Sequence, residues 1–321
     1  MAAPPESDGG ANAAGRVAWV FPGQGSQYVG MGKAVARVDA AAGAVFTTAD
    51  QVLGFGLSEL VFNGPDDELQ RTANQQPAIL ATSIAYFVAL RARGLLPEPS
   101  FVAGHSLGEY GALVAAGALD LTDALRLVRR RGELMEEHGA GGMAAVVGLS
   151  PEAVAAVAAE AGAEVANFNA PDQTTISGRR DAVERAMAIA KERGARRAVL
   201  LPVNAAFHSS LMAPVTEEMS ALIADVPMER VSVPLVANVD ARPIQEPADL
   251  RRELIDQISS PVRWLSVVEG MALAGVTTYH EIGPGKVLAG LIGRTQRGAT
   301  TVTAESLLGT VVTIEEGRAD G

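Results

Sequence analysis

The stretch Phe101-Val102-Ala103-Gly104-His105-Ser106-Leu107-Gly108 decides the fold, because it joins a strand to a helix through a tight turn. Its first residues are apolar and end a strand, and a helix of small residues, 107–118, begins at its end. Gly-x-Ser-x-Gly in this setting fits a nucleophile elbow. Alone, the pattern is also a common glycine-rich turn, and its strand and helix context favours catalysis. Ser106 would then project from the top of a sheet, and the Leu107 N–H at the helix N-terminus would stabilise an oxyanion.

A second loop, Phe21-Pro22-Gly23-Gln24-Gly25-Ser26-Gln27, follows the short apolar strand 17–21. It lacks the Lys-Ser/Thr pair of a Walker loop, and only two of the three glycines of a dinucleotide fingerprint are correctly spaced. A phosphate cradle is therefore excluded. We expect a backbone N–H of this loop, at Gln24, to be the second oxyanion donor.

Strand and helix signals alternate along most of the chain, which predicts a parallel sheet covered by helices. The expected helices are 76–93, 107–118, 151–162, 181–193, 211–224, 247–257 and 287–294. Further strands are expected at 233–239 and 277–282. Residues 142–203 follow the order β-α-β-β-α-β, which is that of a ferredoxin-like fold.

The predicted fold class is therefore α/β, with an α/β-hydrolase-like large domain and an inserted ferredoxin-like small domain. We place the large domain in two segments, 17–138 and 206–304, and the small domain at 139–205. The ends, 1–16 and 305–321, are expected to be tails, the first of them disordered.

Composition excludes several classes of function. The 321 residues include no cysteine, which excludes disulfides, thiolate metal sites and a cysteine nucleophile, and which predicts a cytoplasmic location. No apolar run is long enough for a membrane span, and the N-terminus lacks the pattern of a signal peptide. The net charge of −11 argues against nucleic acid or anionic lipid as the main partner.

A serine nucleophile needs a base, and the chain has four histidines. The turn should aim His105 away from the Ser106 hydroxyl, and His138 is expected to be a solvated linker residue. His280 fits the order serine, acid, histidine of ordinary α/β hydrolases. The residues alone leave both His208 and His280 as candidates.

Taken together, the motifs resemble the malonyl-CoA:acyl carrier protein transacylase family, which includes free-standing acyltransferases of polyketide synthases. The resemblance spans about residues 17 to 295 and keeps the family's order. It rests on Phe21–Gln27, Gln76-Pro77, Gly104–Tyr110, Arg131–Met135, Phe207-His208-Ser209, Gln257, Pro261–Trp264 and Gly283–Lys286.

The resemblance implies roles for individual residues. It makes His208 the base, oriented by the backbone carbonyl of Gln257 instead of an aspartate, so that Asp256 is a helix-surface residue. Arg131 would grip the free carboxylate of a malonyl group as a two-pronged donor. Gln76 and His105 would join it in binding substrate.

Phe207 and Leu107 resemble the malonyl-selective pattern more than the methylmalonyl one. The family implies that malonyl-CoA is the substrate, that an acyl carrier protein is the acceptor, and that neither metal nor cofactor takes part. The pathway would be fatty-acid or polyketide synthesis. The alternative reading is a proofreading hydrolase of acyl thioesters that uses the same serine.

An acidic enzyme and an acidic carrier protein should repel each other. We therefore expect a local basic patch around the mouth of the active-site cleft. The candidates are Arg129, Arg130, Arg251, Arg252, Lys286, Arg294 and Arg297. Arg129 and Arg130 are also candidates for contacts with coenzyme A phosphates.

Overall fold

The computed structural model describes residues 15–203 and 205–309 and contains two separate sheets. The larger sheet has six strands in the order β10-β9-β1-β2-β7-β8, parallel except for the last pair. Its strands are β1 (Arg16–Phe21), β2 (Phe101–Gly104), β7 (Leu235–Val236), β8 (Pro243–Ile244), β9 (Val276–Glu281) and β10 (Thr300–Thr303). The predicted α/β class with a parallel sheet is confirmed.

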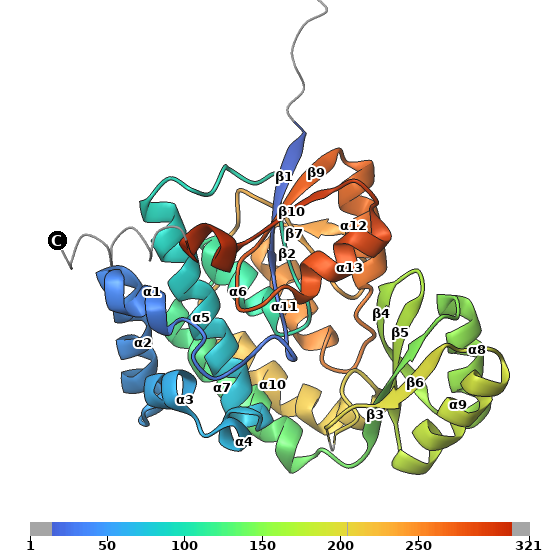
Figure 1. Ribbon diagram of the computed structural model, residues 1–321. Coiled ribbons are helices and arrows are strands. Elements are labelled where there is room, and N and C mark those ends of the chain that lie inside the picture. The colour runs from blue at the N-terminus through green and yellow to red at the C-terminus, as the bar shows by residue number, and fades with distance from the viewer. Residues whose placement is uncertain (1–14, 204, 310–321) are drawn as a thin grey trace, which may run out of the picture.

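Strand β1 lies at the centre of this sheet and is apolar on both faces, as expected for a strand covered on both sides. Its residues Trp19 and Phe21 pack into one core, under the helices α5 (Thr72–Ala92), α6 (Gly108–Ala115) and α7 (Leu121–Glu137). Ala18 and Val20 pack into the other core, under α12 (Trp264–Leu273) and α13 (Val287–Thr295). Figure 1 shows the sheet between these two groups of helices. The loops that follow β1, β2 and β7 leave the same edge of the sheet, where sites form in open parallel sheets.

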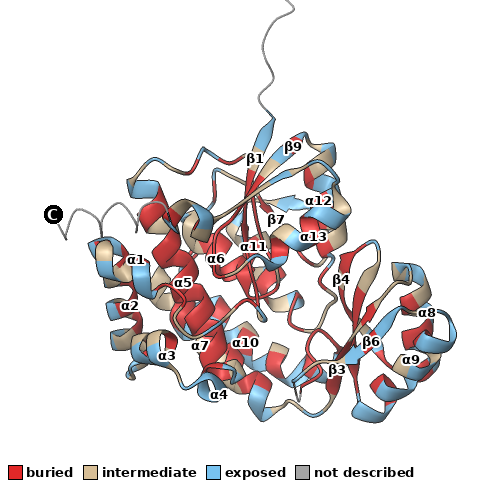
Figure 2. Cartoon of the chain, in the orientation of Figure 1, coloured by how far each residue is buried: buried red, intermediate tan, exposed pale blue. Residues whose placement is uncertain are grey.

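The helices that precede or cover the larger sheet are α1 (Lys33–Val38), α2 (Ala40–Leu53), α3 (Leu57–Asn63), α4 (Asp66–Leu69), α5 (Thr72–Ala92), α6 (Gly108–Ala115), α7 (Leu121–Glu137), the short 3-10 helix η1 (Ser210–Met212), α10 (Ala213–Asp225), α11 (Pro247–Asp256), α12 (Trp264–Leu273) and α13 (Val287–Thr295). Figure 2 shows that α5 is buried along most of its length. It is a central packing element of the fold.

Helix α5 begins at Thr72, earlier than the expected start at 76, and Pro77 lies inside it. Proline inside a helix leaves the carbonyl of residue i−4 without its usual donor, so the sequence favoured a start next to Pro77. Here that carbonyl belongs to Ala73, and it accepts a hydrogen bond of 3.1 Å from the Arg129 guanidinium. A side chain from another helix therefore allows α5 to start a turn sooner.

The smaller sheet is antiparallel, with the strand order β4-β5-β3-β6. It consists of β3 (Gly142–Val147), β4 (Glu164–Ala170), β5 (Gln173–Gly178) and β6 (Arg197–Leu200), covered by α8 (Pro151–Ala161) and α9 (Arg180–Glu192). The element order along the chain is the predicted β-α-β-β-α-β. Strand β4 also contacts the larger part of the fold, where the Val262 N–H donates to the Ala166 carbonyl over 2.8 Å.

Both ends of the chain correct the sequence analysis. Arg16 already belongs to β1, and residues 1–14 of the expected N-terminal tail lie outside the described residues. The sequence analysis missed β10, a threonine-rich edge strand that is only partly buried and so lacks an apolar signal. Leu308, placed in the C-terminal tail, is buried in the main core, and the Glu305 carboxylate accepts a hydrogen bond of 2.6 Å from Tyr28.

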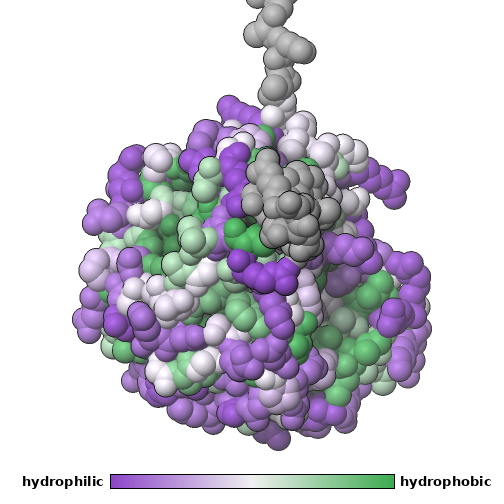
Figure 3. All heavy atoms as spheres, turned by 60° about the vertical axis from the view of Figure 1, so that its left-hand side comes forward, coloured by the Kyte–Doolittle hydropathy of each residue, from purple (hydrophilic) through white to green (hydrophobic). Residues whose placement is uncertain are grey.

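The predicted strand 233–239 is reduced to two residues, because Pro234 precedes it and the chain turns back into β8 after Ala237. No helix in the described residues combines the length and the apolar character needed to cross a bilayer. Figure 3 shows hydrophilic side chains over much of the face it presents, with smaller apolar areas between them.

Candidate active site

Ser106 occupies a strained turn between β2 and α6, with a positive φ of 51°. The flanking glycines leave no room for a side chain. A Cβ on Gly104 would lie 2.0 Å from the backbone of Gly108, and one on Gly108 would lie 2.0 Å from the Phe21 carbonyl oxygen. This tight packing forces the serine out of the regular backbone at the end of β2, which is the geometry of a nucleophile elbow.

Asn238, which follows β7, holds the turn from the neighbouring strand. Its Oδ1 accepts a hydrogen bond of 2.7 Å from the Ser106 N–H, and its Nδ2 donates to the Gly104 carbonyl over 2.7 Å. Sequence reasoning missed this residue. Sites in open α/β sheets form at the carboxyl ends of the strands, so the position of Asn238 just after β7 was the signal that could have found it. The elbow is thus held on both sides of the serine.

His208 is the histidine that reaches Ser106. Its Nε2 lies 2.8 Å from the Ser106 Oγ, and its Nδ1 lies 2.7 Å from the Gln257 carbonyl oxygen. A carbonyl can only accept, so Nδ1 carries the proton and Nε2 is free to accept the serine proton. Burial, and then the charge of Arg131, lower the pKa of His208 to about 3, so the ring is neutral.

The other histidines and the neighbouring acid lie elsewhere. His280 lies within β9, and its buried Nδ1 has no hydrogen-bond partner among the described residues. His138 ends α7 and lies 3.3 Å from a carboxylate oxygen of Glu218. Asp256 is exposed, as expected. The geometry therefore brings together serine, histidine and a backbone carbonyl, without a carboxylate.

Arg131 lies directly beneath the serine and is fully buried. Its guanidinium donates to the Ser106 Oγ over 3.1 Å, to the Gln76 Oε1 over 2.8 Å and to the Gln257 Oε1 over 3.1 Å. Among the described residues it forms no ion pair, and its Nε has no partner. A buried charge without a directly bound counter-charge is costly, and burial lowers the pKa of Arg131.

Gln76, expected to bind substrate, is likewise fully buried and contacts Arg131. Its amide nitrogen lies 3.4 Å from the Met135 sulfur. Neither Gln76 nor Arg131 lines the cavity above Ser106, but the Arg131 guanidinium is hydrogen-bonded to Ser106, which does. Gln76 is connected to the serine through its hydrogen bond with Arg131.

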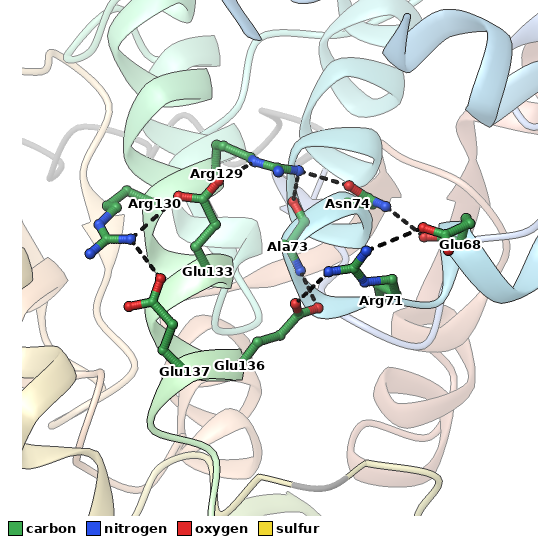
Figure 4. Close-up of polar contacts among 9 residues, drawn as sticks. All are labelled: Glu68, Arg71, Ala73, Asn74, Arg129, Arg130, Glu133, Glu136 and Glu137. Carbon is green, nitrogen blue, oxygen red and sulfur yellow. Dashed lines mark hydrogen bonds and ion pairs between the residues drawn. The ribbon is translucent and has the colours of Figure 1, made fainter. Parts of the chain in front are cut away.

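The two arginines before Arg131 bind other partners: Figure 4 shows Arg129 joining α7 to α5, and Arg130 bound to acidic side chains of α7. Arg129 pairs with Glu133 at 2.7 Å and binds Asn74 as well as the Ala73 carbonyl. Arg130 pairs with Glu137 at 3.0 Å and with Glu218 at 3.2 Å. Both guanidinium groups are thus engaged by protein groups, and their contacts with coenzyme A or a carrier protein stay a prediction.

The remaining candidates for a basic patch are also largely engaged. Arg251 donates to backbone carbonyls at the C-terminal end of α10, Arg252 pairs with Asp249, and Arg294 binds Gln173. Lys286 and Arg297 are exposed, and their side chains have no partner among the described residues. Because Gly285 approaches the Ser26 carbonyl, Lys286 lies beside the loop that carries Gln24.

The two expected oxyanion donors lie at the ends of adjacent strands. Leu107 directly follows the nucleophile, and Gln24 lies in the loop after β1 and lines the cavity above Ser106. In the described part of the chain, no hydrogen bond uses the backbone N–H of either residue. The Gln24 side chain is bound to Gln75 at 2.6 Å. Both amides are therefore available to a negatively charged oxygen.

A cavity of about 400 Å³ lies above Ser106, between the two sheets. Phe207 and His208 line it from the larger part, and Met143 and Leu201 from the smaller part. His105 also lines it, but its Nε2 lies 2.8 Å from the Asn169 Oδ1 on β4. As expected, His105 is turned away from the serine hydroxyl.

Comparison with known proteins agrees with this geometry. Residues 18–316 match the family described as the acyl transferase domain. The chain is 44% identical, over 295 residues, to a malonyl CoA-acyl carrier protein transacylase of Bacillus subtilis, with 89% of this chain and 92% of that protein covered.

Two solved structures are similar over nearly the whole fold. One is an acyl carrier protein S-malonyltransferase from Vibrio cholerae, with a TM-score of 0.87, 42% identity, and coverage of 90% of this chain and 96% of that chain. The other is a malonyl-transacylase in complex with a type II polyketide synthase acyl carrier protein, with a TM-score of 0.87, 39% identity, and coverage of 90% and 95%. The chain belongs to the malonyl CoA-acyl carrier protein transacylase family, whose members carry the acyl transferase domain.

Proposed function

We propose that this protein transfers a malonyl group from malonyl-CoA to the pantetheine thiol of an acyl carrier protein, through an ester on Ser106. The observation that carries the proposal is the buried Arg131 guanidinium, 3.1 Å from the Ser106 Oγ and without an ion pair among the described residues. A carboxylate on the acyl group would supply the direct ion pair that Arg131 lacks. The relatives from Bacillus subtilis and Vibrio cholerae are named for this transfer.

The first half of the reaction loads the enzyme. Ser106 Oγ attacks the thioester carbonyl carbon while its proton passes to His208 Nε2. The backbone N–H groups of Gln24 and Leu107 stabilise the resulting oxyanion. The carbon–sulfur bond then breaks, and the coenzyme A sulfur takes the proton from His208, leaving a malonyl-serine ester.

The second half reverses these steps with a different thiol. The pantetheine thiol gives its proton to His208 Nε2, and its sulfur attacks the ester carbonyl. When the carbon–oxygen bond breaks, Ser106 Oγ recovers the proton. No metal or cofactor is needed, because the serine, the histidine and the two N–H groups supply the nucleophile, the base and the oxyanion site.

The choice of acyl group involves two features. Arg131 would favour acyl groups that carry a carboxylate, with Gln76 holding the guanidinium from behind. Phe207 lines the cavity next to His208 and would leave little space for a methyl branch on the α-carbon of the acyl group. One methyl group gives about 1–3 kcal/mol of discrimination, so the preference for malonyl over methylmalonyl is moderate.

The competing function is hydrolysis of acyl thioesters, because water can attack the same ester. Arg131 favours the transferase, since a proofreading hydrolase has no use for a carboxylate grip. The test is to load the enzyme with malonyl-CoA and to add carrier protein bearing its pantetheine arm. Transfer supports the transferase, and release of free malonate supports the hydrolase.

The architecture and setting complete the proposal. We assign the larger unit, 17–138 and 206–304 with its extension to 309, to an α/β-hydrolase-like domain, and 139–205 to a ferredoxin-like domain. The supporting observations are the elbow after β2 and the strand order β4-β5-β3-β6. The pathway is fatty-acid or polyketide synthesis. The cysteine-free sequence suits the cytoplasm.

The state of His208 predicts the pH dependence of loading. Its pKa of about 3 lies below the ordinary histidine value, so lowering the pH does not protonate the base until strongly acidic solution. We expect the second-order rate constant for loading to change less than about twofold between about pH 8 and pH 5. Rapid mixing, acid quenching and intact-mass spectrometry measure this rate constant. A tenfold fall with a midpoint near pH 6.5 would show that the base is an ordinary histidine.

A further inference from the structure

Glu109 is a buried carboxyl group next to the active site, and it takes no part in either half-reaction proposed for Ser106 and His208. It lies in the first turn of α6 and is fully buried. Its Oε2 accepts a hydrogen bond of 2.5 Å from the Gln257 Nε2, and its Oε1 accepts one of 2.9 Å from the Asn238 N–H. Both partners contact the Ser106 turn, so Glu109 connects two supports of the elbow.

The Gln257 side chain is the link between Glu109 and Arg131. Its Nε2 also donates to the Ser106 carbonyl over 3.2 Å, and its Oε1 accepts from the Arg131 guanidinium over 3.1 Å. An amide has one donor end and one acceptor end. Because Glu109 binds the donor end, the acceptor end faces Arg131. With the amide reversed, an NH₂ group would face the guanidinium, and two donors would oppose each other.

The base does not depend on this side chain. His208 is bound by the Gln257 backbone carbonyl, and the Gln257 backbone is fixed at the end of α11, where its N–H donates to the Glu253 carbonyl over 2.9 Å. Gln257 therefore uses its backbone to orient the base and its side chain to orient the carboxylate grip. A substitution at Glu109 should therefore disturb the position of the Arg131 guanidinium without disturbing the orientation of His208.

A second carboxyl group completes the arrangement. Glu253 accepts from the Asn238 N–H over 2.7 Å, so its oxygen converges with that of Glu109 on the same donor. Burial raises the pKa of both groups, and the charge of Glu253 raises that of Glu109 further. Burial lowers the pKa of Arg131, and the charge of Glu109 opposes this shift, so the carboxyl pair lies electrostatically close to the guanidinium.

We propose that Glu109 is a positioning residue that fixes the orientation of the Gln257 side chain, and through it the guanidinium of Arg131, so that it determines the preference for acyl groups bearing a carboxylate. This inference rests on the proposed function. It assigns specificity to a residue that does not line the cavity above Ser106.

The test compares acylation of Ser106 by malonyl-CoA and by acetyl-CoA, which lacks the carboxylate, in wild type and in Glu109→Leu and Glu109→Gln. Leucine removes both acceptors, so we expect the ratio of the two second-order rate constants to fall about tenfold or more, mainly through slower malonyl loading. Glutamine keeps an acceptor for the Gln257 Nε2, and the Asn238 N–H, which then loses Glu109 Oε1, keeps its acceptor on Glu253. The ratio should then stay within about threefold of wild type.

A matched control is Glu281→Leu. Glu281 is also buried and also accepts two hydrogen bonds, from the Leu288 and Ala289 N–H groups at the start of α13. This variant should lose thermal stability while keeping the malonyl preference. It separates the general cost of deleting a buried carboxylate from the specific effect at Glu109.

An equal fall of malonyl and acetyl loading in Glu109→Leu would show a merely structural role and overturn the inference, as would an unchanged ratio. Should that variant fail to fold, Gln257→Met removes the same contact with Arg131 from the other side, and an unchanged ratio there would equally overturn it. Failure of the proposed function is distinguishable, because wild type itself would then show no preference for malonyl-CoA.

Discussion

Replacing Ser106 with alanine is expected to abolish formation of the malonyl-enzyme. The Oγ is the atom that forms the ester, and it lies 2.8 Å from the base and 3.1 Å from the Arg131 guanidinium. Among the residues that line the cavity above Ser106, no other carries a hydroxyl or a thiol. Intact-mass measurement after incubation with malonyl-CoA should show no added acyl mass, and transfer should fall by at least about 10³-fold.

The control for this variant is Ser177→Ala. Ser177 is another fully buried serine, on β5, whose hydroxyl has no hydrogen-bond partner among the described residues. It should keep wild-type loading. A stable malonyl adduct on the Ser106→Ala protein would contradict the assignment of the nucleophile, and peptide mapping would then identify the residue that carries it.

Replacing Arg131 with alanine has the second largest expected effect. Losing a buried, charge-assisted contact to a substrate carboxylate costs about 2–5 kcal/mol, so malonyl-CoA loading should fall about 30-fold to 10³-fold or more. Acetyl-CoA has no carboxylate, and its loading should fall much less. The measurement is the ratio of the two loading rates, and Arg131→Lys should restore only part of it because lysine lacks the two-pronged geometry.

Arg129→Ala is the matched control, since it removes an arginine two residues away on the same helix. Arg129 supports α5 at Pro77 by binding the Ala73 carbonyl, and it contacts no residue of the serine–histidine pair. We expect lower stability with an unchanged ratio of malonyl to acetyl loading. If Arg129→Ala lost the preference while Arg131→Ala kept it, the carboxylate site would have to be reassigned.

The elbow could be predicted from sequence because its signals are local. Gly104, Ser106 and Gly108 lie within five positions. Both glycines are required because the close backbone contacts of such a strand-to-helix turn leave no room for a Cβ. The βαββαβ order of 142–203 was similarly visible, since each element there carries its own periodicity and caps. The resemblance to the family further selected His208 and Arg131.

The supports of the site could not be predicted because they depend on contacts between distant positions. Asn238 meets Ser106 across 132 positions, and the Gln257 side chain meets Glu109 across 148. Glu109 alone reads as an ordinary acidic residue in the first turn of a helix. Arg129 and Arg131 are equivalent in sequence, and only the packing of α7 against α5 buries one and exposes the other to acidic partners.

The most direct test follows one malonyl group through both half-reactions. Wild-type enzyme is loaded with isotopically labelled malonyl-CoA, freed of excess substrate, and divided between buffer and carrier protein bearing its pantetheine arm. We predict that the label maps to Ser106, persists in buffer, and moves to the carrier protein thiol within the time of a single turnover. Label that leaves the enzyme as free malonate at the same rate with and without carrier protein would contradict the transferase assignment.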